Sequence, residues 1–252
     1  MASVSVVLPT RDRPEFLLEA LGTVARQTHL EMELVLVRDG GAPFSDEVRA
    51  AVDRLEFPAI FEERDEGEGL AQARNRGLAR ARADAVAFLD DDDLWEPDHL
   101  KRLAAAFDRD MEAVVVYSDA TILRDSGERR VLAVPFDRAL FGRNGFIPPS
   151  AFAARRSAFA EYGLFDASMP YSEDWDWLLR VAHRGGKIVR VPGSTATIRI
   201  HDGGLSQLKP DRLAERQRCL DLLSSRYGLG RIEPKTFWEV AGDIRRATPS
   251  ST

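Results

Sequence analysis

The regular alternation of short apolar runs with helix-like segments constrains the fold of this chain more than any other feature. Apolar runs at 4–8, 33–37 and 85–89 have the length and β-branched content of buried strands. Between them, 14–24 and 70–83 carry apolar residues at helical spacing. Strands alternating with helices predict an α/β fold, a mostly parallel open sheet flanked by helices in the Rossmann-like manner. Further elements expected in this half are a helix at 46–55, a strand at 59–61, a helix from Pro97 to 107 and a strand at 113–117.

After about residue 118 the pattern changes. Thr121 to Leu123 and Arg130 to Val134, joined by Asp125-Ser126-Gly127, predict a hairpin. A small antiparallel section is therefore expected beside the parallel strands. The remaining expected elements are helices at 156–162 and 173–184, strands at 187–191 and near 195–200, and C-terminal helices at 208–227 and 234–246.

Composition excludes several classes of protein. The chain of 252 residues is 44% hydrophobic and 30% charged, as in an ordinary globular protein. Its net charge of −6 argues against non-specific nucleic-acid binding, which needs a basic face. Cys219 is the only cysteine, so no internal disulfide is expected, and a reducing cytoplasm fits. No segment approaches the ~18 apolar residues of a membrane span; peripheral attachment to the inner face of the membrane stays open.

Four consecutive aspartates, Asp90 to Asp93, directly follow the apolar run 85–89. Open α/β sheets bind their ligands at the carboxyl ends of strands, and Pro97 confines the run to a short strand-to-helix loop. Four adjacent carboxylates repel one another unless a cation neutralises them, and hard divalent ions bind carboxylates together with substrate phosphates. We therefore prefer a metal–phosphate site to a solvated acidic surface, although the run alone does not say which aspartate touches the metal.

Polar residues also follow the first two predicted strands. Pro9, Thr10 and Arg11 end the first strand, where they could meet a base, a ribose or a phosphate; taken alone, they are more simply explained as a turn and a helix cap. Asp39 ends the second strand and could accept from a base or ribose, or form a plain Asp-Gly turn. Arg74, one turn into a helix, could reach a phosphate or lie on a solvated face.

Two adjacent acids, Glu173 and Asp174, open a predicted helix amid aromatic residues. Ser172 as a cap and the acids as partners of the helix dipole explain them without catalysis. A carboxylate in such a place can equally act as the general base for a hydroxyl nucleophile. Farther on, His201 begins a glycine-containing loop that runs to Ser206; this histidine is either structural or an additional ligand of a carboxylate–phosphate metal site.

Taken together, these segments resemble glycosyltransferase family 2, with the GT-A fold, over roughly Ser3 to Ser206. Each motif is unspecific alone, but their order along the chain is specific. The motifs are Val-Val-Leu-Pro-Thr at 6–10, Val-Arg-Asp-Gly at 37–40, Ala-Arg-Asn-Arg-Gly at 73–77, Phe-Leu-Asp-Asp-Asp-Asp at 88–93, Ser-Glu-Asp-Trp-Asp at 172–176 and the histidine loop at 201–206.

The resemblance implies a metal-dependent, inverting glycosyltransferase. It would move a sugar from a nucleotide-diphosphate sugar to an acceptor hydroxyl in polysaccharide, glycolipid or natural-product glycosylation. Mg²⁺ or Mn²⁺ would be bound by Asp90 and Asp92, with Asp92 the best single candidate, and by His201, which completes the site in some relatives. Asp174 matches the base of the family, and Glu173 is the acid that precedes it.

The resemblance also assigns the donor site. Asp39 would hold the nucleobase, Arg74 would lie near the diphosphate, and Thr10 and Arg11 would line the nucleotide pocket. Pro9, Asp90 and Asp91 complete this candidate set. Arg38 departs from the Asp or Asn common in the family at that position, which puts any further nucleotide contact there in doubt.

A single domain over residues 1–252 is expected. Residues 1–118 would bind the nucleotide sugar and 119–230 the acceptor, while 231–252 form a C-terminal helix and tail. Aromatic residues that could stack on a sugar, although they could simply be core, are Trp95, Phe141, Phe146, Tyr171 and Trp175.

Two alternatives remain at this point. A sugar nucleotidyltransferase would be expected to carry a glycine-rich first loop, and residues 9–14 contain no glycine. A relative that only binds nucleotide or calcium would not be expected to keep both acid clusters. The sequence does not indicate the sugar, the acceptor or the oligomeric state.

Overall fold

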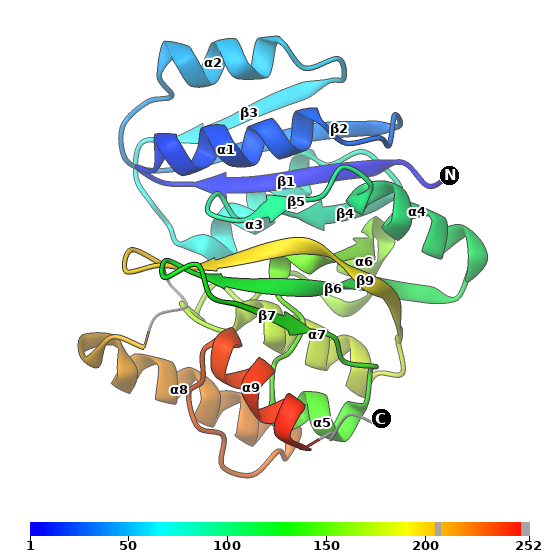
Figure 1. The fold of residues 1–252 in the computed structure, drawn as a ribbon, viewed down its shortest axis with the longest axis vertical. Coiled ribbons are helices and arrows are strands. Elements are labelled where there is room, and N and C mark those ends of the chain that lie inside the picture. The colour runs from blue at the N-terminus through cyan, green and yellow to red at the C-terminus, as the bar shows by residue number, and fades with distance from the viewer. Residues whose placement is uncertain (205–207, 248–252) are drawn as a thin grey trace.

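The computed structural model describes residues 1–204 and 208–247, and these form a nine-stranded sheet with helices packed around it (Figure 1). The strands are β1 Val4–Thr10, β2 Met32–Asp39, β3 Ala59–Arg64, β4 Ala85–Phe88, β5 Leu94–Trp95, β6 Ala113–Arg124, β7 Arg129–Leu132, β8 Phe152–Arg155 and β9 Lys187–Ile200. The helices are α1 Pro14–Ala25, α2 Asp46–Asp53, α3 Leu70–Arg80, α4 His99–Arg109, α5 Arg138–Arg143, α6 Arg156–Tyr162, α7 Glu173–His183, α8 Pro210–Tyr227 and α9 Phe237–Ala247, with a 3-10 turn at Pro149–Ala151.

The strand order is β3-β2-β1-β4-β8-β6-β9-β5, and β7 pairs with β6. Strands β1 to β4 pair in parallel, so their carboxyl ends meet at one edge of the sheet. β8 runs antiparallel between β4 and β6, and β6 and β7 form the predicted hairpin. The predicted α/β sheet with an antiparallel section is therefore confirmed, and the parallel edge positions the ends of β1, β2 and β4 side by side.

Two long strands correct the predicted boundaries. The runs at 113–117 and 121–123 form one strand, β6, and those at 187–191 and 195–200 form one strand, β9. β6 and β9 pair in parallel, with register shifts on either side of Asp119. The Asp119 carboxylate accepts hydrogen bonds from Arg190 at 2.6 and 2.8 Å and from the backbone N–H of Gly193 at 2.8 Å. These bonds keep the irregular stretch in the sheet, which local sequence patterns do not reveal.

Short elements account for the other differences. The sequence did not predict β5, β8 or α5, whose 2, 4 and 6 residues are too few for a periodic pattern. The helix expected at Pro97 begins at His99, and β1 continues through Pro9 to Thr10. The division expected at about residue 118 stays a prediction, and β6 runs through it. Ser206 and the tail 248–252 lie outside the described residues.

The helices that follow the sheet gather at one end of the molecule. In Figure 1, α5, α7, α8 and α9 lie together at the lower end, away from β1 to β3. Within the described ranges, no helix is long and apolar enough to cross a membrane. Asp90, just after β4, and residues of α7 and α8 line one pocket.

α3 packs very closely against β1 at Gly77. A Cβ atom added at Gly77 would lie 2.3 Å from Cγ1 of Val7, far inside van der Waals contact. Gly77 is thus needed for packing, although glycine lowers intrinsic helix stability. This packing places the N-terminal half of α3, which carries Arg74 one turn from its start, against the sheet edge.

We expect Gly77→Ala to lower the free energy of unfolding by about 1–3 kcal/mol through overpacking. Gly22→Ala in α1 is the matched control, because its added Cβ would come no closer than 3.4 Å to Arg26 and should be neutral or stabilising by up to about 1 kcal/mol. Urea unfolding followed by tryptophan fluorescence would measure both. Equal effects of the two substitutions would contradict the close contact.

Candidate active site

A pocket of about 180 Å³ lies where the sheet edge meets the later helices. Its residues come from the start of α3, the end of β4, the loop before the 3-10 turn, the start of α7, α8 and the segment that leads into α9. Its lining includes Arg74, Asp90, Glu173, Asp174 and Trp175. The pocket therefore brings together two acid groups that are far apart in the sequence.

Arg74 links these two acid groups. Its side chain is 1% exposed and donates to Oδ1 of Asp90 at the end of β4 and to Oε1 of Glu173 at the start of α7. Burial opposes its charge, but the two acids raise the pKa of Arg74. The buried guanidinium therefore acts as a brace across the pocket, which the sequence did not predict. Contact of Arg74 with a diphosphate remains untested.

Three carboxylates lie near the single positive charge of this guanidinium. Burial raises the pKa of Glu173 to about 7, although Arg74 opposes the shift and Asp174 adds to it. Burial likewise raises the pKa of Asp174, with Arg74 again opposing. Because Arg74 carries one positive charge against Asp90, Glu173 and Asp174, the cluster retains a proton more readily than isolated acids do. Asp174 lines the pocket and makes no ion pair within the described residues.

The four aspartates have different surroundings. Asp91 accepts from Oγ1 of Thr10 at 2.7 Å and lies 3.3 Å from Arg13. Burial raises the pKa of Asp91 to about 6, with Arg13 opposing. Asp93 accepts from Oγ of Ser150 at 2.6 Å. Asp91 and Asp93 are thus tied into the fold, whereas Asp90 keeps a side chain that is 25% exposed.

Asp92 faces His201. Nε2 of His201 lies 3.0 Å from Oδ2 of Asp92, and Nη1 of Arg13 lies 2.6 Å from the same oxygen. Burial would raise the pKa of Asp92, but His201 and Arg13 lower it overall. The ring of Phe16 lies 4.6 Å from that of His201 and fixes one side of the imidazole.

The donor atoms suit a divalent cation that completes its coordination with substrate. A carboxylate and an imidazole converge at Asp92 and His201, and Mg²⁺ typically takes one or two carboxylates plus phosphates. Over residues 1–204 and 208–247, however, no group of three or more His, Cys, Asp or Glu is arranged as a metal site. Asp90 lies against Arg74 instead. The chain itself therefore neutralises part of the acidic run through Arg13 and Arg74.

Asp39 is also engaged within the chain. Its carboxylate accepts from the backbone N–H groups of Glu68 and Gly69 at 3.0 and 2.8 Å and from Arg76 at 2.8 Å. It thereby holds the loop that leads into α3. Arg38 pairs with Glu63. Its guanidinium is thus occupied locally, while the predicted nucleobase contact of Asp39 stays a prediction.

The family model described as Glycosyl transferase family 2 matches residues 5–163. The chain belongs to this family. It is therefore a glycosyltransferase, and the family resemblance drawn from the ordered motifs is confirmed. The match covers the ends of β1, β2 and β4 but stops before Glu173 and Asp174.

Related proteins support the assignment. The uncharacterized glycosyltransferase YwdF of Bacillus subtilis (strain 168) is 32% identical over 93% of this chain and 87% of that protein. A PGL/p-HBAD biosynthesis glycosyltransferase of Mycobacterium bovis (strain BCG / Pasteur 1173P2) is 32% identical over 82% and 80%. The mannosyltransferase PcManGT of Pyrobaculum calidifontis, solved in complex with GDP-Man and Mn²⁺, has the same fold. Its TM-score is 0.69 at 19% identity, over 96% of this chain and 69% of that one.

In this glycosyltransferase the predicted site residues form two groups. Asp90, Glu173 and Asp174 meet around Arg74 in the pocket. Thr10, Asp91, Asp92 and His201 lie together beside it through direct contacts. Of the remaining residues, Pro9 is buried in β1, Asp39 supports α3, and the Arg11 side chain is 60% exposed.

Sequence analysis did not identify Arg13 or Ser150 as site residues. Arg13 lies between β1 and α1 and bonds Asp92, while Ser150 bonds Asp93 from the turn before β8. Neither residue belongs to a recognisable motif, so only their placement in space reveals them. Among the aromatic candidates, Trp95, Phe141 and Phe146 are core residues, whereas Tyr171 and Trp175 line the pocket.

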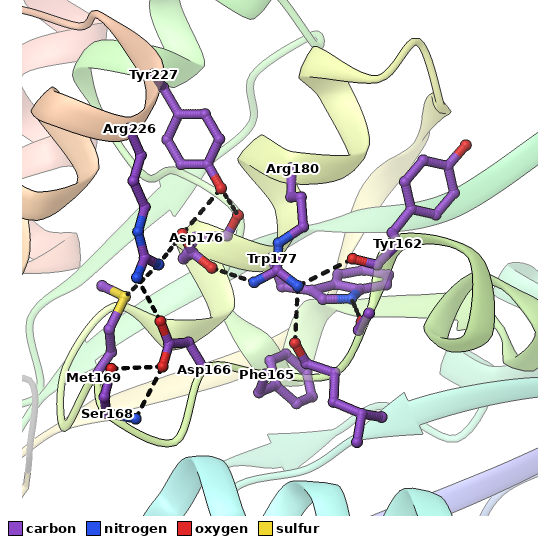
Figure 2. A network of polar contacts seen from close by, with 12 residues as sticks. Tyr162, Phe165, Asp166, Ser168, Met169, Asp176, Trp177, Arg180, Arg226 and Tyr227 are labelled. Carbon is purple, nitrogen blue, oxygen red and sulfur yellow. Dashed lines mark hydrogen bonds and ion pairs between the residues drawn. The ribbon is translucent and has the colours of Figure 1, made fainter.

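Asp176, the last residue of the Ser-Glu-Asp-Trp-Asp motif, is structural. Its side chain is fully buried and binds Arg180, Arg226 and Tyr227 (Figure 2). Nη1 of Arg226 lies 3.0 Å from Oδ1 of Asp176, and the Tyr227 hydroxyl donates to the same oxygen at 2.9 Å. This network ties α8 to α7 and so fixes the helix that begins with Glu173.

Ser172 occupies the predicted cap position but makes no side-chain capping bond, since its backbone is left-handed at φ 61°. This conformation turns the chain sharply before Glu173. The acids of the first turn still complement the helix dipole.

Asp176→Asn should lower the free energy of unfolding by about 1.5–3 kcal/mol, because the fully buried carboxylate loses its charge-assisted hydrogen bonds to Arg180 and Arg226. Asp221→Asn, on the exposed face of α8, should stay within about 0.5 kcal/mol of the parent. Urea unfolding would measure both. A near-neutral Asp176→Asn would show that the network does not hold α7 and α8 together.

The raised pKa of Glu173 predicts a pH dependence of stability. Between its ordinary value of 4.5 and about 7, the folded state binds more protons than the unfolded state. The free energy of unfolding therefore falls as pH rises through this window, by at most about 3 kcal/mol from this group. Glu173→Gln should flatten the dependence between pH 4.5 and 7 in urea unfolding.

Glu112→Gln is the control for this measurement, because the Glu112 side chain is 86% exposed. It should leave the pH dependence as in the parent protein. An unchanged slope in Glu173→Gln would mean that Glu173 is already ionised across the window.

Proposed function

We propose that this glycosyltransferase is metal-dependent and inverting, and that it moves a sugar from a nucleotide-diphosphate sugar to an acceptor hydroxyl. The observation that carries the proposal is the meeting of two acid groups at one pocket. Asp90, from the acidic run that follows β4, and Glu173 and Asp174, which open α7, line this pocket with Arg74 between them. A single displacement needs a stabilised leaving group on one side of the sugar and a base on the other.

The leaving-group side is built by the acidic run and His201. We assign Asp90, Asp92 and His201 to the divalent cation, Mg²⁺ or Mn²⁺; Asp92 and His201 already converge at 3.0 Å. When bound, the cation supplies charge neutralisation of the diphosphate as it departs. Arg13 supports this side by holding Asp91 and Asp92 in place.

The nucleotide is assigned to the neighbouring strand ends. Pro9 and Thr10 end β1, Arg11 follows it and Asp39 ends β2, and both strand ends lie on the sheet edge that carries Asp90. Thr10 also holds Asp91 at 2.7 Å. Asp39 supports the loop of Glu68 and Gly69, so it shapes this site as well as offering an acceptor.

Asp174 is the proposed base. Glu173 is held by Arg74 and its side chain is 4% exposed, so it cannot readily reach a substrate. Asp174 lines the pocket and has no ion-pair partner among the described residues. Burial raises the pKa of Asp174, which makes its carboxylate a stronger proton acceptor for an attacking hydroxyl.

Names of related proteins support the substrate class without specifying it. PcManGT was solved with GDP-Man and Mn²⁺, and the mycobacterial relative is named for PGL/p-HBAD biosynthesis. We infer a nucleotide-diphosphate sugar as the donor and an acceptor of the saccharide or glycolipid kind.

A thermal-shift panel of UDP-, GDP- and dTDP-sugars with and without Mg²⁺ or Mn²⁺ tests the donor class and the need for metal, because a ligand that binds the native state raises its stability. No metal-dependent shift with any donor would overturn the proposal.

Two substitutions separate the proposed roles. Asp174→Asn should reduce transfer by about 10²-fold or more, as expected for the loss of a general base, while the Kd for the donor stays near that of the parent. Asp92→Ala should instead weaken metal-dependent donor binding. Nucleoside diphosphate release and calorimetric donor titration measure the two effects. Near-normal turnover by Asp174→Asn would exclude it as the base.

A further inference from the structure

Two arginines of the pocket, Arg143 and Arg216, have no acidic partner among residues 1–204 and 208–247. The guanidinium of Arg216 lies 4.5 Å from the ring centroid of Tyr171, and its Nε is buried without a hydrogen-bond partner. Within the described part of the chain, neither arginine forms an ion pair with Asp or Glu. Burial lowers the pKa of Arg216, and no nearby carboxylate offsets it. Arg216 is half-buried and Arg143 is exposed; a half-buried guanidinium without an acidic partner favours an anionic ligand.

Most other charges of the pocket are compensated. The ion pairs are those of Arg74 with Asp90 and Glu173, of Lys235 with Asp243 and of Glu233 with Arg231. This leaves Asp174, the proposed base, and the guanidinium groups of Arg143 and Arg216. The single charge of Arg74 is shared by Asp90, Glu173 and Asp174, so the pocket as a whole is not positive. Its α5 and α8 side, however, presents Arg143 and Arg216 with no acid paired to them among the described residues, which favours a negatively charged group on that side.

The unpaired arginines belong to the acceptor side of the pocket. Asp92 and His201, assigned to the metal and diphosphate, do not line the pocket, and only Asp90 reaches it from the acidic run. Arg216 comes from α8 and Arg143 from the end of α5. They share the pocket with Asp174, and Asp90 is the one proposed metal ligand that lines it with them.

We propose that the acceptor carries an anionic group, a phosphate or a carboxylate, which Arg216 and Arg143 bind while the acceptor hydroxyl faces Asp174. This inference rests on the proposed function. The rest of the acceptor would lie against the apolar walls of the pocket. These walls are Leu70, Ile147, Leu220, Ile232, Phe237 and Val240.

The test measures binding of three matched probes by calorimetry: methyl glucoside, methyl glucoside 6-phosphate and methyl glucuronide. The protein is first saturated with Mg²⁺ and the nucleoside diphosphate of its donor, which blocks the diphosphate site. At least one anionic probe should bind about tenfold or more tightly than the neutral one, and Arg216→Gln should remove that preference. Arg216→Lys should keep part of it, because the charge remains.

Arg218→Gln is the matched control on α8, since the Arg218 side chain is 71% exposed and does not line the pocket. It should bind all three probes as the parent does. Equal binding of neutral and anionic probes, or an anionic preference that Arg216→Gln leaves intact, would overturn the anionic acceptor. A rise in the donor Kd in Arg216→Gln, with probe binding unchanged, would assign Arg216 to the donor and also overturn it.

Failure of this inference is distinguishable from failure of the proposed function. The thermal-shift panel with nucleotide sugars tests the donor and metal without any acceptor. If a nucleotide sugar binds in the presence of metal but the parent protein binds neutral and anionic probes equally, the anionic acceptor is rejected and the proposed function is retained. Urea unfolding of Arg216→Gln and Arg216→Lys shows whether each variant is folded before it is titrated.

Discussion

The arrangement of the site depends on one buried guanidinium. Arg74 joins Asp90 at the end of β4 to Glu173 at the start of α7. Buried charges are stable only when paired, so the three groups hold one another in a fixed relation. Through this brace, the carboxyl edge of the parallel sheet is connected to the later helices. The acid that follows, Asp174, takes its position from the same brace.

The four aspartates of the acidic run differ in their contacts. Asp91 and Asp93 are bound by Thr10 and Ser150 and act as parts of the fold. Asp92, beside His201, and the partly exposed Asp90 are the members that we propose for the cation. Repulsion within the run is relieved partly by arginines of the chain itself, Arg13 and Arg74. This reduces the cost of assembling four carboxylates in one short loop.

The second acid group depends on packing far from the sheet edge. Asp176, on the same helix as Asp174, is fully buried among Arg180, Arg226 and Tyr227, and so links α7 to α8 (Figure 2). α8 in turn places Arg216 in the pocket. One motif thus contributes a candidate base and a structural anchor, separated by a single residue. The side of the pocket that we propose for the acceptor is therefore formed by helix packing.

The sequence by itself determined the α/β class, the family and the acids on both sides of the site, because strand–helix alternation and the order of motifs are local properties of the chain. The tertiary structure alone decided which of those acids are available. Arg13, Arg74 and Ser150 act across long separations in sequence, on Asp92, Glu173 and Asp93. Ion pairs and burial depend on which elements pack together, and no local pattern records that. The continuity of β6 and β9 was missed for the same reason, since pairing between the two strands, rather than propensity, carries them through their irregular centre.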